Sequence, residues 1–447
     1  MNTNTVREKA DETFVRLCEV WDYGIDQAKS QRGFLKKDYW KTGNTVDCVI
    51  NYLVQTNQKD EKRRIRDSFD YVYAHLLYPD HWRDDYGWWG NALVNACRPA
   101  SNGKPSHAAI LGFTDEDVDQ FLAGAKECWN VLRKSADENL QYYNNCTDTA
   151  LKKVLPSLGG GYCAWNHDSV EKYLSDKSIT YVPNTVTNVG YWALSIGLYE
   201  ITPGSAQAEK LKYKEAIEET LNWFITVSNQ KYDNESILLN TKNLIRETVN
   251  PWAHSEKWCH DASRGWTADQ GVYLYCLYKC LTIFPHLSTP INALFLPVRE
   301  GFMPNSGNSS NTLVCDGSFR EYVTLPVPED YDSNVGNFND NYCTGPGVLV
   351  RYLAAATDPI IYQYIKPVVK RSVETVWTNR DQDPKQDKVK IKNQILCWWE
   401  PIRDSDYSDR FLKDNDGRNE EIWYLALQAS GLDLFTAALR MNINEAD

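Results

Sequence analysis

The 447-residue sequence lacks several features that mark whole classes of protein. No window approaches the roughly 18 uninterrupted apolar residues that a membrane-spanning helix requires, so we expect no membrane span. Basic residues are not in excess either: the formal net charge is −12, which argues against nucleic acid or anionic lipid as a partner. The segment from Met1 to Asp11 is polar and has no apolar stretch typical of a signal peptide. We therefore expect a cytoplasmic protein, or an extracellular or cell-envelope protein if a signal peptide was removed.

Disulfide and metal-site signatures are weak. The chain has 12 cysteines, but no Cys-x-x-Cys pair occurs. Most of them are expected to be small buried apolar residues. Cys259 and His260, with His254, hint at metal ligation, yet no second cluster has the spacing of a zinc site. We expect neither a metal ion nor another cofactor.

Linkers and repeats are missing too, since no Pro- or Ser-rich segment divides the chain and no solenoid period occurs. Apolar residues recur instead at three- and four-residue spacing, which predicts about eleven or twelve helices. We expect them to form one domain over residues 1–447, and the protein to be a monomer. Loops are expected at 33–43 and 305–332, and a short extended excursion at 236–248. The predicted helices lie at about 5–28, 44–55, 62–77, 84–98, 114–134, 185–202, 206–227, 267–281, 348–357, 360–377 and 420–438, with a weaker candidate at 291–301.

Aromatic residues, in contrast, are abundant. The chain has 16 Trp and 27 Tyr, more than a core built from Leu, Ile and Val requires. This abundance predicts an extended aromatic surface of the kind that binds sugars, other ring-bearing ligands or cations.

Two adjacent acids, Asp84 and Asp85, lie in an aromatic segment that runs from His81 to Gly90. Neighbouring side chains on a helix diverge by roughly 100°, so both acids cannot face one core, and burying both charges unpaired would be costly. Carboxyl groups roughly 5 Å apart at the mouth of a cavity would suit double displacement at the anomeric carbon of a sugar. The alternative, that two Asp at a helix start cap it and complement its dipole, stays open.

Five segments, taken in order, resemble glycoside hydrolase family 76. That family comprises endo-α-1,6-mannanases and related cell-wall transglycosylases, built as an all-α (α/α)6 barrel. The resemblance covers about residues 10–440 and implies this fold, a retaining mechanism and an oligosaccharide or polysaccharide substrate. The segments are Asp84-Asp85-x-x-Trp88-Trp89, Gly159-Gly160-Gly161 before Trp165-Asn166, Asn184-Thr185-x-x-Asn188 leading into Leu198–Thr202, Trp266–Gly271, and Gly347–Leu353.

The resemblance implies that Asp84 is the nucleophile and Asp85 the general acid/base. Asp84 would attack the anomeric carbon, while Asp85 protonates the leaving oxygen and then deprotonates the incoming water or sugar hydroxyl. Because Asp85 must hold its proton, we expect it in the drier, more aromatic surroundings. Arg83 could instead pair with either carboxylate and keep it ionised. The implied substrate-binding residues are Trp88, Trp89, Trp165, Asn166, Asn188, Trp266, Asp269 and Gln270.

The segments depart from the family pattern on the side that binds substrate. Tyr162–Ala164 precedes Trp165 where the family has paired Trp, Pro183 replaces a Lys, and Asp269 replaces an Asn. These changes leave open an enzyme of the same fold that uses Asp acid catalysis in an aromatic pocket on a small hydrophobic metabolite, as a cyclase or isomerase. A non-catalytic carbohydrate-binding protein is a third hypothesis.

Several of the implied residues fit structural roles as well. Trp165 and Trp266 are equally suited to a core or to a sugar platform. Asn188 and Gln270 would bind substrate hydroxyls or tie helix ends to loops. Asp269 would be a cap if it lies at a helix start. An open groove with exposed Trp would favour a polymer, and a closed apolar pocket a small metabolite.

Overall fold

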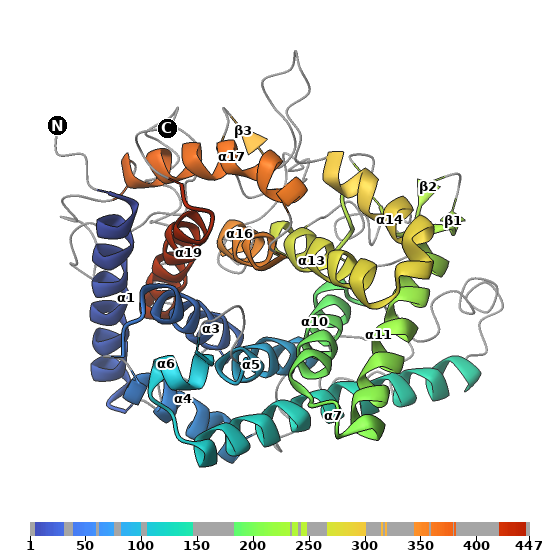
Figure 1. The fold of residues 1–447 in the computed structure, drawn as a ribbon, viewed down its shortest axis with the longest axis horizontal. Coiled ribbons are helices and arrows are strands. Elements are labelled where there is room, and N and C mark those ends of the chain that lie inside the picture. Colours follow the sequence, from blue (N-terminus) through green and yellow to red (C-terminus); the bar gives the residue numbers. More distant parts are fainter. Residues whose placement is uncertain are drawn as a thin grey trace, which may run out of the picture. The chain divides into compact units, whose positions relative to one another are not determined.

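The computed structural model describes the chain in ranges: residues 5–30, 39–59, 62–75, 82–99, 105–145, 183–232, 235–239, 243–247, 266–300, 314–315, 318–319, 344–356, 359–378, 380 and 420–443. Its elements are α-helices, one 3-10 turn and short antiparallel strand pairs (Figure 1). The chain divides into two compact units, each built from separate stretches of sequence. Unit 1 holds Met1–Thr56, Trp266–Gly271 and Gly301–Asp447, and unit 2 holds Asn57–Gly265 and Val272–Glu300. The single domain over 1–447 stays a prediction.

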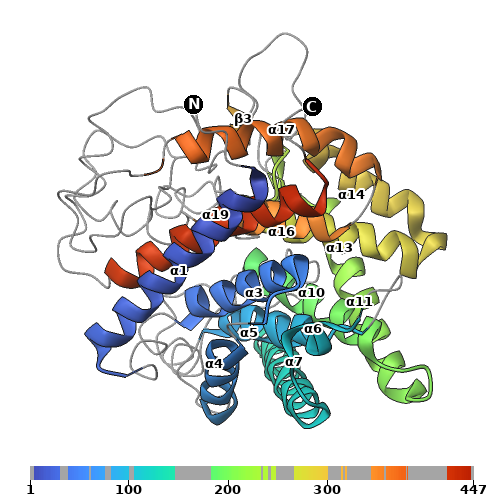
Figure 2. The ribbon, with the colours of Figure 1, turned by 60° about the vertical axis from the view of Figure 1, so that its left-hand side comes forward.

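Unit 1 is organised around its last helix. α19 packs against α1, α3, α16 and α17, and both ribbon views show α1 beside it (Figure 1, Figure 2). Its side chains Leu425, Leu432 and Phe435 are fully buried and carry the apolar core of this unit. The elements are α1 (Val6–Ala28), α3 (Tyr39–Thr56), the first turn of α13 (Thr267–Ile283), β3 (Val314–Cys315), β4 (Ser318–Phe319), α16 (Gly345–Ala356), α17 (Pro359–Thr378) and α19 (Glu420–Arg440).

Unit 2 is organised around α10, which packs against α5, α7 and α11. Its apolar positions, among them Val189, Trp192 and Leu198, are fully buried. The elements are α4 (Lys62–His75), α5 (Arg83–Ala96), α6 (His107–Leu111), α7 (Asp115–Asn145), α10 (Thr185–Ile201), α11 (Gln207–Ser228), β1 (Lys231–Tyr232), β2 (Glu235–Ser236), the remainder of α13, η1 (Pro285–Leu287) and α14 (Ser288–Glu300).

The predicted helices are present, and local sequence explains where several begin. Thr5 accepts from the backbone N–H of Glu8, whose carboxylate accepts from the N–H of Thr5, so α1 starts in a capping box. Thr114 and Asp117 make the same reciprocal pair at the start of α7. α6 was not predicted, because five residues are too few to show a helical period.

The loop predicted at 33–43 is wrong from Tyr39 onward, where α3 already begins. Lys41, Thr42 and Gly43 are buried, so packing inside unit 1 outweighs the weak helix propensity of glycine. Thr42 also donates its hydroxyl proton to the Tyr39 carbonyl over 2.9 Å, which satisfies a polar group in this buried turn. The extended excursion predicted at 236–248 agrees with a bridge between Leu239 and Ile245, and the β1–β2 pair lies just before it, at 231–236.

Most tryptophans whose side chains are described build the core and do not form the predicted aromatic surface. Large rings pack against one another inside each unit, as Trp192 does on Phe224 with centroids 5.2 Å apart. The expectation of an extended aromatic surface is therefore wrong for the described part of the chain. Among the described tryptophans, Trp40 and Trp377 are half-buried, and Trp82 is exposed, with 49% of its surface accessible. The buried tryptophans are Trp21, Trp88, Trp89, Trp129, Trp192, Trp223 and Trp266.

Most of the described cysteines are buried, as expected of small apolar side chains. Cys48, Cys97, Cys128, Cys276 and Cys280 are buried free thiols. Among the described residues no single helix is long and apolar enough to cross a membrane. One sharply bent pair, Thr267–Ile283 with Pro285–Arg299 at 119°, meets the criteria of length and composition.

Candidate active site

The aspartate pair lies in the first turn of α5. Trp82 holds the N-cap position without a side-chain capping bond, and Arg83 is the first helical residue. The backbone N–H of Asp85 donates to the Trp82 carbonyl over 3.1 Å. Neither Asp84 nor Asp85 is the N-cap, so the capping alternative holds only as charge in the first turn, where carboxylates complement the helix dipole.

Close packing between α5 and α10 fixes where this turn lies in unit 2. A Cβ at Gly87 would lie 3.3 Å from the Cα of Gly190, and one at Gly197 would lie 2.6 Å from Val94 Cγ1. Asn91 locks the crossing by donating to the carbonyls of Gly87 and Gly190 over 2.8 and 3.0 Å. Because the contacts advance in the same direction along both helices, the two N-terminal ends lie at the same end of the pair.

The start of α10 brings a third acid to this end. Asn184 caps the helix by accepting from the N–H of Thr187 over 3.2 Å. The next residue, Thr185, donates its N–H to the carbonyl of Glu247 over 2.7 Å and its hydroxyl to the carbonyl of Arg246. The segment 243–247 is thereby docked on the start of α10, and the charge of Glu247 acts on Asp84.

The carboxyl of Asp84 is held in an environment that favours its neutral form. Burial raises its pKa from 3.8 to about 7, and the negative charge of Glu247 adds to the increase, while the backbone N–H groups of Asp84 and Asp85 oppose it. Asp84 Oδ1 is buried and has no hydrogen-bond partner among the described residues. Asp84 can therefore gain or lose its proton near neutral pH. Asp85 is buried as well, at 6% exposure, and its role as acid/base stays a prediction. The raised pKa belongs to Asp84, although the proton-holding acid was expected to be Asp85.

The other predicted residues on α5 and α10 lie inside unit 2. Trp88 and Trp89 are 5% and 0% exposed, so their rings belong to the core in this structure. Asn188 is fully buried and donates to the carbonyl of Asn184 over 2.7 Å. That bond ties down the helix start, which is the structural role weighed for this residue. Contact of these three side chains with substrate stays a prediction.

Three further predicted residues belong to unit 1, at the start of α13. Trp266, Asp269 and Gln270 are all buried, and Trp266 makes an edge contact with Trp40 at 5.8 Å. Gln270 donates to the Trp266 carbonyl over 3.1 Å, again a helix-start tie. Asp269 lies in the first turn of α13. Trp165 and Asn166, with the glycine segment before them, lie outside the described residues.

The two late sequence segments meet in unit 1. A Cβ at Gly271 would lie 2.5 Å from the Cα of Leu349, so only glycine allows α13 and α16 to approach this closely. Gly347 is equally constrained, with the Cα of Ser430 at 2.5 Å, and its N–H donates to the Ser430 hydroxyl over 3.1 Å. The glycines of these segments therefore have a packing role.

Two residues of this region were not identified as site residues from the sequence. Glu247 follows the buried residues Leu244, Ile245 and Arg246, and no local pattern indicates that its backbone pairs with the start of α10. Trp82 was one of many aromatic residues in its segment, and only the structure separates it from its buried neighbours. Among the described residues no group of three or more His, Cys, Asp or Glu could hold a metal ion, and His254, Cys259 and His260 lie outside them.

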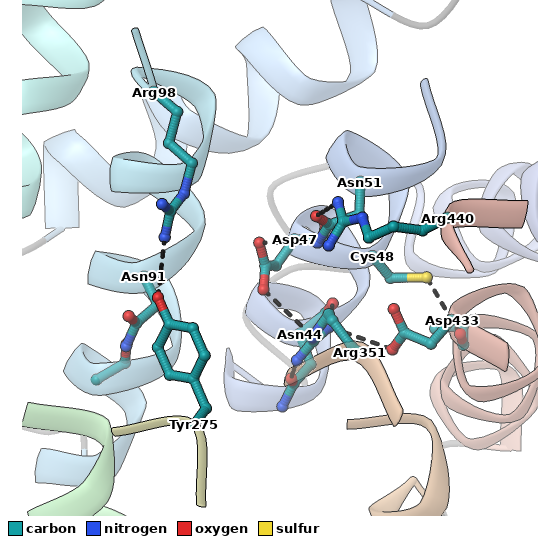
Figure 3. A network of polar contacts seen from close by, with 12 residues as sticks. Asn44, Asp47, Cys48, Asn51, Asn91, Arg98, Tyr275, Arg351, Asp433 and Arg440 are labelled. Atoms are coloured by element: carbon teal, nitrogen blue, oxygen red, sulfur yellow. Dashed lines mark hydrogen bonds and ion pairs between the residues drawn. The ribbon is translucent and has the colours of Figure 1, made fainter. Parts of the chain in front are cut away.

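Unit 1 contains another buried acid with a raised pKa, Asp433, in a polar network (Figure 3). Arg351 lies 3.3 Å from Asp433 and 3.4 Å from Asp47, and donates to the carbonyl of Asn44 over 3.1 Å. Burial raises the pKa of Asp433 to about 7; Arg351 lowers it and Asp47 raises it. The Cys48 thiol lies against the same carboxyl and donates to the Ala429 carbonyl over 3.1 Å.

The sequence matches no protein-family model and no curated protein. Solved structures do match the fold. One is an inactive variant of the alpha-1,6-mannanase GH76A of Salegentibacter sp. HEL1_6, with two adjacent aspartates changed to asparagine, in complex with alpha-1,6-mannotriose. It is 13% identical, with TM-score 0.54 over 90% of each chain. The chain has the fold of the family 76 glycoside hydrolases.

Two further solved structures match the same fold. Dfg5 from Chaetomium thermophilum, in complex with glucosamine, is 13% identical with TM-score 0.55, over 96% of this chain and 90% of that one. A GH76 alpha-mannanase of Bacteroides thetaiotaomicron is 11% identical with TM-score 0.51, over 99% and 97%. The predicted all-α (α/α)6 barrel is confirmed, and so, at the level of the fold, is the resemblance indicated by the five segments.

Proposed function

We propose that the chain is a retaining glycoside hydrolase or transglycosylase acting on α-mannosides of the α-1,6-mannan type. The observation that carries this proposal is the pair Asp84 and Asp85 in the first turn of α5. Burial raises the pKa of Asp84 to about 7. On the same fold, the inactive mannanase variant carries asparagine at two adjacent aspartates. Sugars are bound in two of the matched structures, which favours a carbohydrate over a small hydrophobic metabolite.

In the first step Asp84 is the nucleophile. Its ionised carboxylate attacks the anomeric carbon and forms a glycosyl ester, while the bond from that carbon to the leaving oxygen breaks. Asp85 gives its proton to the leaving oxygen and becomes a carboxylate. In the second step Asp85 takes a proton from water or from a sugar hydroxyl, whose oxygen displaces Asp84. The two inversions together retain the configuration of the anomeric carbon.

The surroundings of Asp84 suit this role. A carboxylate withdrawn from water is more reactive, and the N–H groups of the first helical turn stabilise its negative charge without a cation that would mask it. Because Asp84 must be ionised to attack, activity should increase as the pH rises through about 7. Within unit 2, Trp88 and Trp89 support the site by packing α5 into the core, and Asn188 by tying down the start of α10.

An aryl α-1,6-mannobioside tests the two roles separately. Asp84→Ala should abolish turnover, because no glycosyl ester can form. Asp85→Ala should keep part of its turnover, since an activated aryl leaving group needs little protonation. Azide should rescue Asp85→Ala to a glycosyl azide of retained configuration. Equal and modest losses from both variants, following a fall in thermal stability, would contradict the assignment and favour a structural role at the helix start.

A further inference from the structure

We propose that the indole of Trp82 is the stacking platform for a hexopyranose unit bound next to the Asp84–Asp85 pair. The inference rests on the proposed function and adds to it the residue that holds the sugar. Trp82 is 49% exposed, whereas the other tryptophans on α5, Trp88 and Trp89, are 5% and 0% exposed. A large rigid ring left in water beside two carboxylates is suited to a ligand that has both an apolar face and hydroxyl groups.

Tryptophan is also an unfavourable residue at the N-cap position of α5, which Trp82 occupies. The N-cap position favours Ser, Thr, Asp and Asn, whose side chains accept from the N–H groups of the first turn. Trp82 accepts no such bond with its side chain, although its backbone has the extended conformation of an N-cap, with φ −63° and ψ 148°. Trp82 therefore exposes a large apolar ring to water and also leaves the helix without a side-chain cap. Natural proteins break such local preferences mainly at functional sites.

The platform is rigidly connected to the acids. The Asp85 N–H donates to the Trp82 carbonyl over 3.1 Å, so the backbone of Trp82 is part of the first turn. Residues two apart in the chain have Cα atoms separated by at most about 7 Å, which places Trp82 within the reach of one sugar unit from Asp84.

Binding can be measured without turnover in an Asp84→Asn background. We would titrate α-1,6-mannotriose by calorimetry into this parent and into Trp82→Ala, Trp82→Phe and Trp82→Ser made in it. The matched control is Tyr73→Ala, because Tyr73 on α4 is an aromatic residue of the same unit with 50% exposure. Trp82→Ala and Trp82→Ser should weaken binding about tenfold, Trp82→Phe should recover most of it, and Tyr73→Ala should bind like the parent.

Trp82→Ser separates binding from folding. Serine is a preferred N-cap, so the melting temperature should stay equal or increase while the affinity falls. The proposal is overturned if Trp82→Ala binds within twofold of the parent, or if Trp82→Phe binds no better than Trp82→Ala. Loss of binding at Trp82 in a chain whose unsubstituted form turns over no mannoside would uphold the platform and refute the proposed catalysis. Absence of any binding to parent and unsubstituted chain would refute both.

Discussion

Asp84 of unit 2 and Asp433 of unit 1 have similarly raised pKa values but oppositely charged neighbours. Burial raises the pKa of each to about 7. Asp433 has a cation at 3.3 Å and belongs to a network in which Arg351 also serves Asp47. Asp84 forms no ion pair with a described residue, and its acidic neighbour is Glu247. In the first arrangement the buried carboxyl has a cation to pair with. The second leaves a carboxyl unsatisfied, which is expected where it must react.

The largest expected effect is on catalysis by Asp84→Asn. The substitution keeps the shape of the side chain but removes the nucleophile, so kcat/KM on an aryl α-mannobioside should fall by about 10⁴-fold or more. Asp433→Asn makes the same chemical change in unit 1 and should alter kcat/KM by less than about threefold. The asparagine resembles the protonated Asp433 that the chain already forms near pH 7. Comparable activity losses in both variants would remove the functional distinction between the two acids.

Arg351→Met should have the largest effect on stability. The variant removes the cation that Asp433 and Asp47 share, and the free energy of unfolding at pH 8 should fall by about 3–5 kcal/mol. The control is Arg371→Met on α17, whose partner Glu374 is exposed like Arg371 itself, and it should cost less than about 0.5 kcal/mol. Urea unfolding followed by circular dichroism gives both values. Equal losses would show that the network is not a stabilising feature of unit 1.

The free energy of unfolding should depend on pH through the protonation of both Asp84 and Asp433. A carboxyl whose pKa rises on folding binds its proton more tightly in the folded state, so its contribution is fully present below pH 3.8 and is lost as the pH rises to about 7. Asp84→Asn and Asp433→Asn should each match the parent at about pH 3.5 and exceed it by up to about 4 kcal/mol at pH 8. A variant less stable than the parent at pH 8 would mean that its ionised carboxylate is favourably paired.

The smallest expected effect is that of Glu247→Gln on the activity profile. Removing the negative charge of Glu247 should lower the pKa of Asp84, so the rise of kcat/KM with pH should move to lower pH by a fraction of a unit. Glu219→Gln, at an exposed ion pair with Arg133, provides the control and should leave the profile in place. A shift to higher pH in Glu247→Gln would contradict the placement of Glu247 beside Asp84.

The sequence predicted the helices well because each has an apolar stripe and a recognisable start, as α1 and α7 do at Thr5 and Thr114. It also singled out Asp84 and Asp85. Glu247 was not predictable, because its position depends on a backbone bond to Thr185, far away in the sequence.

The sequence also did not indicate which aromatic side chains near the acids are buried and which are exposed. Trp82, Trp88 and Trp89 are the same residue type within one segment, and only helix packing leaves one exposed and the others in the core. The Arg351 network has the same origin, since Asp47 and Asp433 are ordinary charged positions on helices until α3, α16 and α19 pack together.

Trapping the covalent intermediate tests the central claim most directly. A fluorinated α-1,6-mannobiosyl fluoride, which forms a glycosyl ester faster than water removes it, would be incubated with the unsubstituted chain and with Asp85→Ala. Intact-mass spectrometry followed by peptide mapping would then locate the sugar. The account predicts a single mannobiosyl ester on Asp84, absent from Asp84→Asn. An ester on another residue would contradict it, and so would the absence of any covalent adduct from a chain that turns over mannosides with inversion.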